Sequence, residues 1–553
     1  MAEVIFYPAK RSISVDEGTT ILQAARLAGV LVESPCNCSG TCRKCKVKLD
    51  GDSLRHVKQR SFLGRPDITL GIVLSCETVI LGDISVKVFP IDHYLPRQVP
   101  GKASPLGHEP FVRKVFSETE QNTRIFAGDS LLAIEAGNTE CTSFGVAIDI
   151  GTTTLAAALI DMTTGVQTAS VSALNPQSQY AQDVMSRIKF ASDAIGLHEM
   201  RTLLITKINC MLEELQSLAR VAASSIYEVV FSGNTCMLHL AMGLDPVSLG
   251  KYPYRSLIAG DVNNNASDCN LIMAESGLIY VPPVISAYIG ADISSGILAT
   301  NLHKLNGVTL LVDIGTNGEI VMGIDGTLYA TSAAAGPAFE GMNISCGMRA
   351  AKGAIEAFAF DQENGIITET IGGATATGIC GSGLLDIVGE LAEHGVINKN
   401  GRFNDPCSGA IHPILQERLV LLEGNLAFKI AENIFLTQAD VRQVQLAKGA
   451  LRAGIEMLLM ETGKAAPMVD RVFIAGSFGY HLKEKNLLGV GLLPLEFAGK
   501  IDFVGNTSLS GGQAFLLNRS ARGEIAAVVE NIRVIEPGQY KDFDRLFVSC
   551  LTF

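Results

Sequence analysis

The sequence contains no tryptophan, no surplus of positive charge and no run approaching the ~18–20 apolar residues that a membrane-spanning helix requires. A net charge of −12 argues against nucleic acid as a partner. The chain runs directly into Val4–Tyr7 without the basic region, apolar core and cleavage site of an export signal. We therefore expect a cytoplasmic protein with no nucleic-acid or membrane partner. Its 553 residues predict several compact units.

Two common signatures of enzymes are also missing. The pair Gly-Lys is never followed by Ser or Thr, which excludes a Walker-type phosphate loop, and no His-Glu-x-x-His is present. There are thirteen cysteines, an odd number in a chain without a leader, and this does not suit a disulfide framework. The cysteines therefore indicate metal or redox chemistry.

One pattern occurs twice. Residues 146–158 read VAIDIGTTTLAAA and residues 310–322 read LLVDIGTNGEIVM. Each predicts two apolar strands joined by a tight polar turn. The turns offer backbone N–H groups, hydroxyls and a Gly that lets a phosphate approach the main chain. Asp149 and Asp313 lie at the mouths of the two turns, where a carboxylate can hold a metal's waters or orient an attacking water.

The copies are 313 − 149 = 164 residues apart, which is the scale of a half-domain, so two facing halves with a cleft are expected. The paired hairpins resemble the phosphate motifs of the actin, Hsp70 and sugar-kinase superfamily of ATPases. The alternative is a pair of ordinary half-buried turns. The resemblance implies that Mg²⁺ and ATP bind at Asp149, Gly151, Thr152, Thr153, Asp313, Gly315, Thr316 and Asn317, with Gly336 near the cleft and Gly476, Ser477 and Gly479 at the adenosine.

The N-terminal cysteines are closely spaced. Cys36, Cys42 and Cys45 form C-x5-C-x2-C, and Cys76 follows after thirty residues. The segment resembles a [2Fe–2S] ferredoxin of β-grasp fold, with these four cysteines as cluster ligands. A structural zinc site and plain buried cysteines are the alternatives. Cys38 is interpreted as a bystander because Cys36 has the better spacing. Cys346 and Cys380, near the cleft, could hold a second cluster but are more simply buried apolar side chains.

Five prolines within twenty-one residues follow this segment and predict an extended, fairly stiff tether, either packed on the next domain or swinging. The predicted fold class is a multidomain α+β protein in four parts. They are a β-grasp ferredoxin domain at 1–90, a Pro-rich linker and short connecting segment at 91–142 with one expected strand at Ser130–Ala136, and two ribonuclease-H-like α/β ATPase lobes at 143–305 and 306–553.

The combination of ferredoxin and ATPase resembles the ATP-dependent reductive activators of corrinoid proteins. The resemblance also involves Asn175–Ile188 and Gly336–Gly341, and spans almost the whole chain. It implies that a corrinoid protein with inactive Co(II) receives one electron, giving Co(I), at the expense of ATP. An upstream low-potential donor would reduce the cluster.

Two departures from the family pattern leave details open. Cys38 and Arg43 stand where Gly is common in the cluster loop, and the segment before the first hairpin is short, so both a monomer and a homodimer stay possible. Three other functions are alternatives: an electron-donating activator of an acyl-CoA dehydratase or reductase, a metabolite kinase with a fused redox domain, and a chaperone-like protein in which ATP controls partner affinity.

Overall fold

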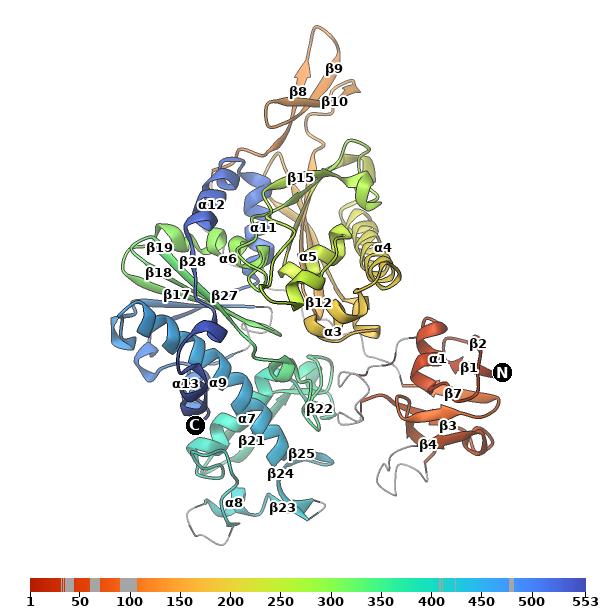
Figure 1. Cartoon of the computed structure of the whole chain (residues 1–553), viewed down its shortest axis with the longest axis vertical. Helices are drawn as coiled ribbons and strands as arrows, with labels where there is room; N and C mark the ends of the chain where they lie inside the picture. Colours follow the sequence, from red (N-terminus) through yellow and green to blue (C-terminus); the bar gives the residue numbers. More distant parts are fainter. Residues whose placement is uncertain are drawn as a thin grey trace.

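The structure, a computed structural model, describes residues 1–30, 32, 34, 44–59, 70–89, 107–406, 409, 411–422, 424–476 and 482–553. A small N-terminal module lies beside a larger body built on two six-stranded sheets (Figure 1). None of the helices within these ranges is long and apolar enough to cross a lipid bilayer.

The N-terminal module is a five-stranded mixed sheet of order β2-β1-β7-β3-β5 packed against one helix. Its elements are β1 (Ala2–Tyr7), β2 (Arg11–Val15), α1 (Ile21–Leu27), β3 (Lys46–Leu49), β4 (Val57–Gln59), β5 (Ile72–Leu74), β6 (Thr78–Ile80) and β7 (Ile84–Val88). Helix α1 begins at a capping box in which Thr20 and Gln23 satisfy each other's backbone N–H. This hairpin, helix and sheet confirm the predicted β-grasp arrangement.

The next part of the chain is a three-stranded antiparallel sheet. It comes after the proline-rich segment, in which residues 90–106 lie outside the described ranges. Its strands are β8 (Val112–Ser117), β9 (Asn122–Ala127) and β10 (Ser130–Ala136), and they project from the body in Figure 1. Only β10 was predicted. One face is anchored by Lys114, which forms an ion pair of 2.8 Å with Glu135 and lies over the ring of Tyr227.

The first large sheet, in lobe I, has the order β13-β12-β11-β14-β16-β15. Lobe I contains β11 (Phe144–Ile150), β12 (Thr154–Asp161), β13 (Gln167–Leu174), α3 (Val184–Phe190), α4 (Ala194–Ala219), β14 (Ile226–Gly233), α5 (Thr235–Met242), β15 (Val262–Asn265), β16 (Leu278–Val281) and α6 (Ala291–Thr300). Strands β11, β12 and β13 are antiparallel, whereas β14 and β16 run parallel to β11.

The second large sheet, in lobe II, repeats this order as β19-β18-β17-β26-β27, with β28 at the edge. Its framework consists of β17 (Val308–Ile314), β18 (Gly318–Ile324), β19 (Thr327–Ala333), α9 (Gln438–Glu461), β26 (Arg471–Ala475), β27 (Ile501–Gly505), α11 (Thr507–Leu517), α12 (Ser520–Asn531) and β28 (Arg533–Val534). Three antiparallel strands followed by two parallel ones occur in both lobes, which confirms the predicted duplication.

Lobe II also carries inserted elements. They are β20 (Ala354–Asp361), β21 (Gly365–Thr370), β22 (Gly378–Ile379), α7 (Gly381–Glu393), α8 (Pro413–Gln416), β23 (Leu419–Leu422), β24 (Asn425–Ala431), β25 (Ile434–Thr437), α10 (Glu484–Gly489) and α13 (Phe543–Ser549). Helix α7 packs on β20 and α10, and α13 packs on α9.

Helices α6 and α11 pack against each other between the two sheets, and they share one apolar core with strands of both lobes. The helix backbones are very close, because a Cβ on Gly511 would lie 2.1 Å from the carbonyl oxygen of Ser295. Helix α11 comes from the end of lobe II yet packs on β11 and β14 of lobe I. This crossing brings the two hairpins into one site.

Candidate functional site

The two predicted hairpins are present, and their acidic residues occupy equivalent positions. Asp149 is the last residue but one of β11, and Asp313 is the last but one of β17. Asp149 lies opposite Ala156 in the strand ladder, whereas Asp313 lies opposite Glu319. Like charges in directly opposed positions destabilise a sheet. The second hairpin therefore keeps two carboxylates side by side at an energetic cost, which is typical of a functional site.

Four carboxylates gather between the lobes: Asp149, Asp292, Asp313 and Glu319. Asp292 lies in the first turn of α6 and accepts a hydrogen bond of 3.0 Å from the N–H of Ile293. Burial raises the pKa of Asp292 to about 8, and the charges of Asp313 and Asp149 contribute. Burial and the charge of Asp149 raise the pKa of Asp313 to about 7.

Glu319 and Asp149 follow the same trend. Burial, with the charges of Asp292 and Asp313, raises the pKa of Glu319 well above its ordinary value. Burial also raises the pKa of Asp149. Glu319 is buried, and Asp149, Asp292 and Asp313 are half-buried. Such a group of closely placed carboxylates is the donor set that a hard divalent cation neutralises. These residues therefore fit Mg²⁺.

Two polar side chains from lobe II hold the carboxylate of lobe I. Asn506 Nδ2 donates to Asp149 Oδ2 and Ser508 Oγ donates to Asp149 Oδ1, both over 2.8 Å. Neither residue was predicted from the sequence, and neither were Asp292 and Glu319. A signal was available, because Gly505-Asn506-Thr507 repeats Gly233-Asn234-Thr235 at the end of a buried strand.

The first hairpin turn is held in place by three side chains. The Asn175 side chain donates to the carbonyl oxygen of Gly151 over 2.9 Å, and Asn234 donates to Thr152 Oγ1 over 3.0 Å. The fully buried Arg187 donates to the carbonyl oxygen of Thr152 over 2.5 Å. Burial lowers the pKa of Arg187 to about 10, so it stays charged near neutral pH. A fixed cation directly behind the turn favours a bound phosphate.

The other residues of this turn keep its shape. A Cβ on Gly151 would lie 2.4 Å from the carbonyl oxygen of Thr154, so only glycine fits. The carbonyl oxygen of Thr153 accepts a hydrogen bond of 2.9 Å from the N–H of Asn175.

The second turn is bonded to the glycine-rich segment that follows its hairpin. The N–H of Gly315 donates to the carbonyl oxygen of Asn317 over 3.1 Å, and Thr316 Oγ1 donates to Glu340 Oε1 over 2.5 Å. Gly336 starts this segment with a φ of +74°, and a Cβ there would meet no atom within 4 Å. Gly336 therefore borders open space, as a residue beside a ligand should.

The third predicted glycine motif is only partly described. Gly476, at the end of β26, has a φ of +106°, and a Cβ there would lie 3.0 Å from Asp313 Oδ1. The motif therefore starts directly beside the acidic residues. Ser477 and Gly479 lie outside the described residues.

Two of the four predicted cluster ligands can be placed. Cys45 precedes β3 and Cys76 follows β5, and their sulfur atoms are 3.2 Å apart in a buried position. The hydrogen bond from Cys76 lowers the pKa of the Cys45 thiol to about 6. Two close thiols, of which Cys45 has a lowered pKa, suit a shared metal centre. Cys36, Cys42, Cys38 and Arg43 lie outside the described residues.

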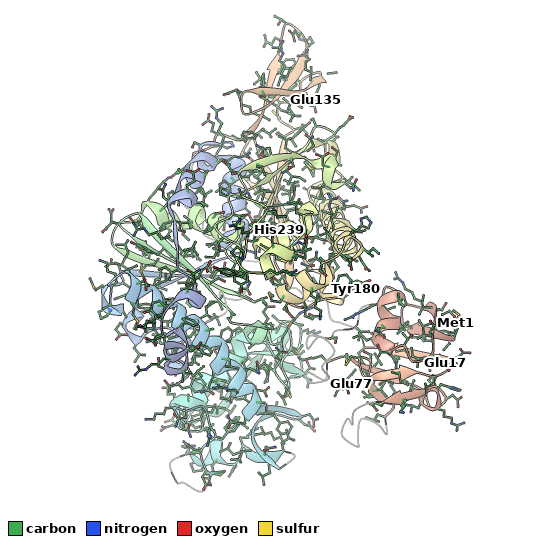
Figure 2. The ribbon with its side chains drawn as sticks, viewed as in Figure 1. Met1, Glu17, Glu77, Glu135, Tyr180 and His239 are labelled. Atoms are coloured by element: carbon green, nitrogen blue, oxygen red, sulfur yellow. The ribbon has the colours of Figure 1, made fainter. Side chains whose placement is uncertain are left out.

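The N-terminal module contacts both lobes. Lys44, next to Cys45, donates to the carbonyl oxygen of Gly347 in lobe II. The guanidinium of Arg26 lies 6.0 Å from the ring centre of Tyr180 in lobe I. Figure 2 shows Tyr180 on the side of the body that faces the module. The thiol of Cys346, close to Lys44, has a pKa raised by burial, which agrees with an ordinary buried cysteine.

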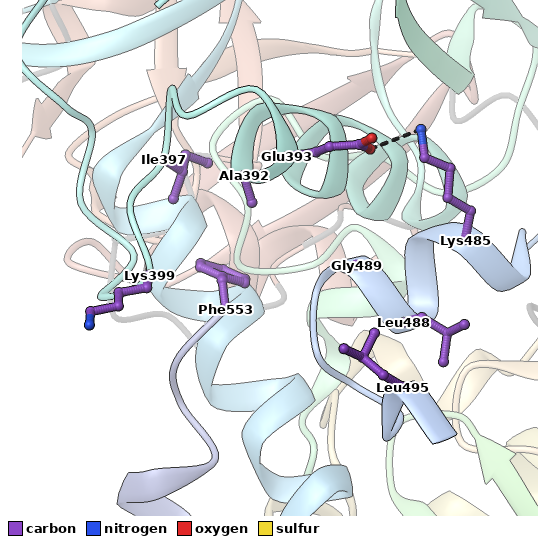
Figure 3. Close-up of a pocket in the computed structure, with 9 residues that line it drawn as sticks. All are labelled: Ala392, Glu393, Ile397, Lys399, Lys485, Leu488, Gly489, Leu495 and Phe553. Atoms are coloured by element: carbon purple, nitrogen blue, oxygen red, sulfur yellow. Dashed lines mark ion pairs between the residues drawn. The ribbon is translucent and has the colours of Figure 1, made fainter. Parts of the chain in front are cut away.

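A separate cavity of about 490 Å³ lies in lobe II near the described end of the chain (Figure 3). It is lined by Ala392, Glu393, Ile397, Lys399, Lys485, Leu488, Gly489, Leu495 and Phe553. Lys485 is held by Glu393 over 2.9 Å and by Glu390 over 3.0 Å. None of the residues predicted from the sequence lines this cavity.

Three family models match consecutive parts of the chain. Residues 5–81 match a 2Fe-2S iron-sulfur cluster binding domain, 144–305 match the RACo middle region, and 307–553 match the C-terminal domain of RACo, the ASKHA domain. Fold and site thus define a two-lobed ATPase fused to a [2Fe–2S] ferredoxin module, which confirms the predicted fold class and the cofactors [2Fe–2S], ATP and Mg²⁺.

Two relatives and one solved structure are similar to most or all of the chain. The corrinoid activation enzyme RamQ of Eubacterium limosum is 28% identical, covering 95% of this chain and 94% of its own length. A Co(II) methylated amine-specific corrinoid protein reductase of Methanosarcina barkeri is 26% identical over 70% of this chain and 73% of its own. A solved reductive activator for a corrinoid, iron-sulfur protein superimposes with a TM-score of 0.73 at 29% identity, covering 100% and 98%. The chain belongs to the RACo family of ATP-dependent reductive activators of corrinoid proteins.

Proposed function

We propose that the chain returns the inactive Co(II) form of a methyl-transfer corrinoid protein to Co(I), using ATP and an electron carried by its N-terminal module. The observation that carries this proposal is the coexistence of two sites in one molecule, joined at a contact. Cys45, whose thiol is close to that of Cys76, directly follows Lys44 in the chain, and Lys44 is bonded to the lobe that carries Asp313.

The energetics explain why an ATPase is attached. For a one-electron step, every ~59 mV uphill lowers the equilibrium constant tenfold. A cluster of moderate potential therefore cannot populate Co(I) appreciably by itself. ATP binding or hydrolysis supplies the difference by changing how the module and the corrinoid protein are held. One electron is added to Co(II), and a low-potential donor protein then restores the reduced module.

We assign the electron-carrying part to residues 1–90, with Cys36, Cys42, Cys45 and Cys76 as the thiolate ligands. When bound, the [2Fe–2S] cluster accepts and donates single electrons. The protein's task is to hold the thiols deprotonated and close together, which the lowered pKa of Cys45 supports.

The nucleotide lies between the lobes 143–305 and 306–553 in this proposal. The turns at Gly151–Thr153 and Gly315–Asn317 present N–H and hydroxyl groups to the phosphates, Gly336 borders the nucleotide, and we assign Gly476, Ser477 and Gly479 to the adenosine. Asp292 and Glu319 complete the set that would hold Mg²⁺. In this proposal Asp313 accepts the proton of the attacking water, and Asp149 orients that water.

The experiment separates the two sites by substitution. Cys42→Ala should abolish the visible [2Fe–2S] spectrum while nucleotide binding, followed by calorimetry, stays intact. Asp149→Ala and Asp313→Ala should retain the spectrum and lose ATPase activity. Full ATPase activity in Asp313→Ala, or an unchanged spectrum in Cys42→Ala, would contradict the assignment. Three further points stay predictions: the low-potential electron donor, the oligomeric state (monomer or homodimer) and the cytoplasmic location.

A further inference from the structure

Several aromatic side chains on lobe I are exposed and form a patch. It consists of Tyr252, Tyr254, Leu257 and Tyr288, and we refer to it as the tyrosine patch. The rings of Tyr252 and Tyr254 have centres 6.0 Å apart, and those of Tyr254 and Tyr288 are 5.4 Å apart. Tyr252 is 81% exposed and Leu257 is 59% exposed. Exposed, mutually packed tyrosines are typical of the energetic centre of a protein interface.

The patch is held in a definite conformation. Tyr288 Oη donates to the carbonyl oxygen of Leu249 over 3.0 Å, and Ser248 Oγ donates to the carbonyl oxygen of Arg255 over 2.6 Å. Tyr254 adopts a φ of +52°, a strained value for a residue with a large side chain. The loop thus holds the partly exposed ring of Tyr254 on a strained backbone.

Both loops of the patch are attached to one helix, α5. Thr235 Oγ1, in its first turn, donates to the carbonyl oxygen of Ser286 over 2.7 Å, in the loop of Tyr288. His239, one turn later, accepts a hydrogen bond of 3.0 Å from the N–H of Leu257 through Nε2. Its Nδ1 therefore donates to the carbonyl oxygen of Thr235 over 2.8 Å.

The same helix reaches the candidate nucleotide site. Its N-cap Asn234 donates to Thr152 Oγ1 in the first hairpin turn. The loop of Tyr288 is also linked to the nucleotide site along the chain, because Asp292 comes four residues after Tyr288. A shift of the hairpin turn or of Asp292 on nucleotide binding would therefore reach the tyrosine patch through direct bonds.

The position of the patch indicates what binds there. Gly250, next to its first loop, packs on Ile188 and Met185 of α3, since a Cβ at Gly250 would lie 3.1 Å and 3.7 Å from them. Helix α3 lies toward the N-terminal module in Figure 1. The tyrosine patch is thus connected to the helix of lobe I that lies toward the electron-carrying module. Lys251 and Arg255, both exposed within a chain of net charge −12, favour a partner with an acidic rim.

Building on the proposed function, we infer that the tyrosine patch is the docking surface for the Co(II) corrinoid protein, and that nucleotide binding adjusts its affinity through α5. The patch supplies aromatic anchors, the two cations select an acidic rim, and the bonds of Asn234, Thr235 and His239 transmit the state of the cleft.

The test compares Tyr252→Ser/Leu257→Ser with the control Ile195→Ser/Leu218→Ser, which replaces exposed apolar residues of α4 in the same lobe. The probe is a purified methyl-transfer corrinoid protein in the Co(II) state that the wild type reduces. Binding is measured by interferometry at two salt concentrations, with ATPase activity and sedimentation in parallel. The patch variant should bind at least about tenfold more weakly with unchanged ATPase activity, and the control should bind like the wild type.

The outcomes are distinguishable. If the wild type reduces no corrinoid protein, the proposed function fails and the inference with it. If the wild type reduces its partner and the patch variant binds equally well, only the inference is overturned. A changed sedimentation coefficient without weaker partner binding would assign the patch to a second copy of the chain and also overturn it. Thr235→Val should reduce the difference in affinity with and without Mg-ATP, and an undiminished difference would contradict the link through α5.

Discussion

Asp292 and Glu319 distinguish this acidic site from a simple pair of hairpin aspartates. Glu319 is buried and Asp292 is half-buried. Each lies near two other carboxylates, and the pKa values of both are raised. Retaining such groups costs stability unless a cation neutralises them. The residues themselves thus indicate that the empty and the metal-bound proteins differ in both charge and stability.

The first prediction concerns Asp292→Asn. Because one ligand and one buried charge are removed, Mg²⁺-dependent ATPase activity should fall by roughly 100-fold, while the metal-free protein should melt at a higher temperature at pH 8. Steady-state kinetics and calorimetry measure the two effects. Glu213→Gln on the exposed face of α4 is the control and should change neither. Unchanged activity would remove Asp292 from the site.

The second prediction concerns pH. The carboxyl groups of Asp313 and Asp292 keep their protons to pH values of about 7 and 8 when folded, whereas in the unfolded chain they lose them near 3.8. The folded state therefore binds more protons between pH 4 and 8, so its stability should fall as pH rises through this window. Melting temperatures without Mg²⁺ should decline, and Mg-ATP should reduce the decline. A Mg²⁺-independent profile would contradict the shared-cation account.

At the scale of elements, the crossing of α6 and α11 joins the lobes. The third prediction uses two glycines with opposite surroundings. Gly511→Ala places a Cβ against the carbonyl oxygen of Ser295, so unfolding free energy should fall by about 1–3 kcal/mol. Gly523→Ala, in α12, meets no atom within 4 Å and should stabilise the helix by up to about 1 kcal/mol. Denaturant titrations distinguish the signs, and equal effects would contradict the close crossing.

The elements differ in how well the sequence predicts them. The hairpins at Asp149 and Asp313 were predictable because an apolar run, a glycine turn and a second apolar run are all local features. The strands Val112–Ser117 and Asn122–Ala127 were missed because their charged residues interrupt the alternation of apolar and polar side chains. Lys114 can be buried there because it pairs with Glu135 and lies over the ring of Tyr227, and neither contact is visible in the local sequence.

The candidate site likewise contains residues that the local sequence predicts and residues that it does not. Gly151, Thr152 and Thr316 stand inside a repeated motif, so their place was visible in the sequence. Asn506 and Ser508 act on Asp149 from 357 and 359 residues away, a proximity that only the crossing of α11 onto lobe I creates. Long-range contacts of this kind leave little local signal.

At the scale of the whole molecule, the N-terminal module is joined to lobe II through Lys44 and Gly347. The fourth prediction is that Lys44→Gln loosens this docking, because the ammonium donor is replaced by a shorter amide. Small-angle scattering should show a larger radius of gyration, while ATPase activity should stay unchanged. Lys87→Gln, on an exposed part of β7, is the control. A compact Lys44→Gln protein would show that other contacts hold the module.

The whole-molecule account depends on coupling between ATP and electron transfer. The most direct measurement is anaerobic optical spectroscopy of a purified Co(II) corrinoid protein mixed with the reduced chain, with and without Mg-ATP. The account predicts that the Co(I) absorption appears only when Mg-ATP is present and that it is lost in both Cys76→Ala and Asp313→Ala. Formation of Co(I) at the same rate without nucleotide, or its complete absence across corrinoid proteins despite an intact cluster and ATP turnover, would contradict it.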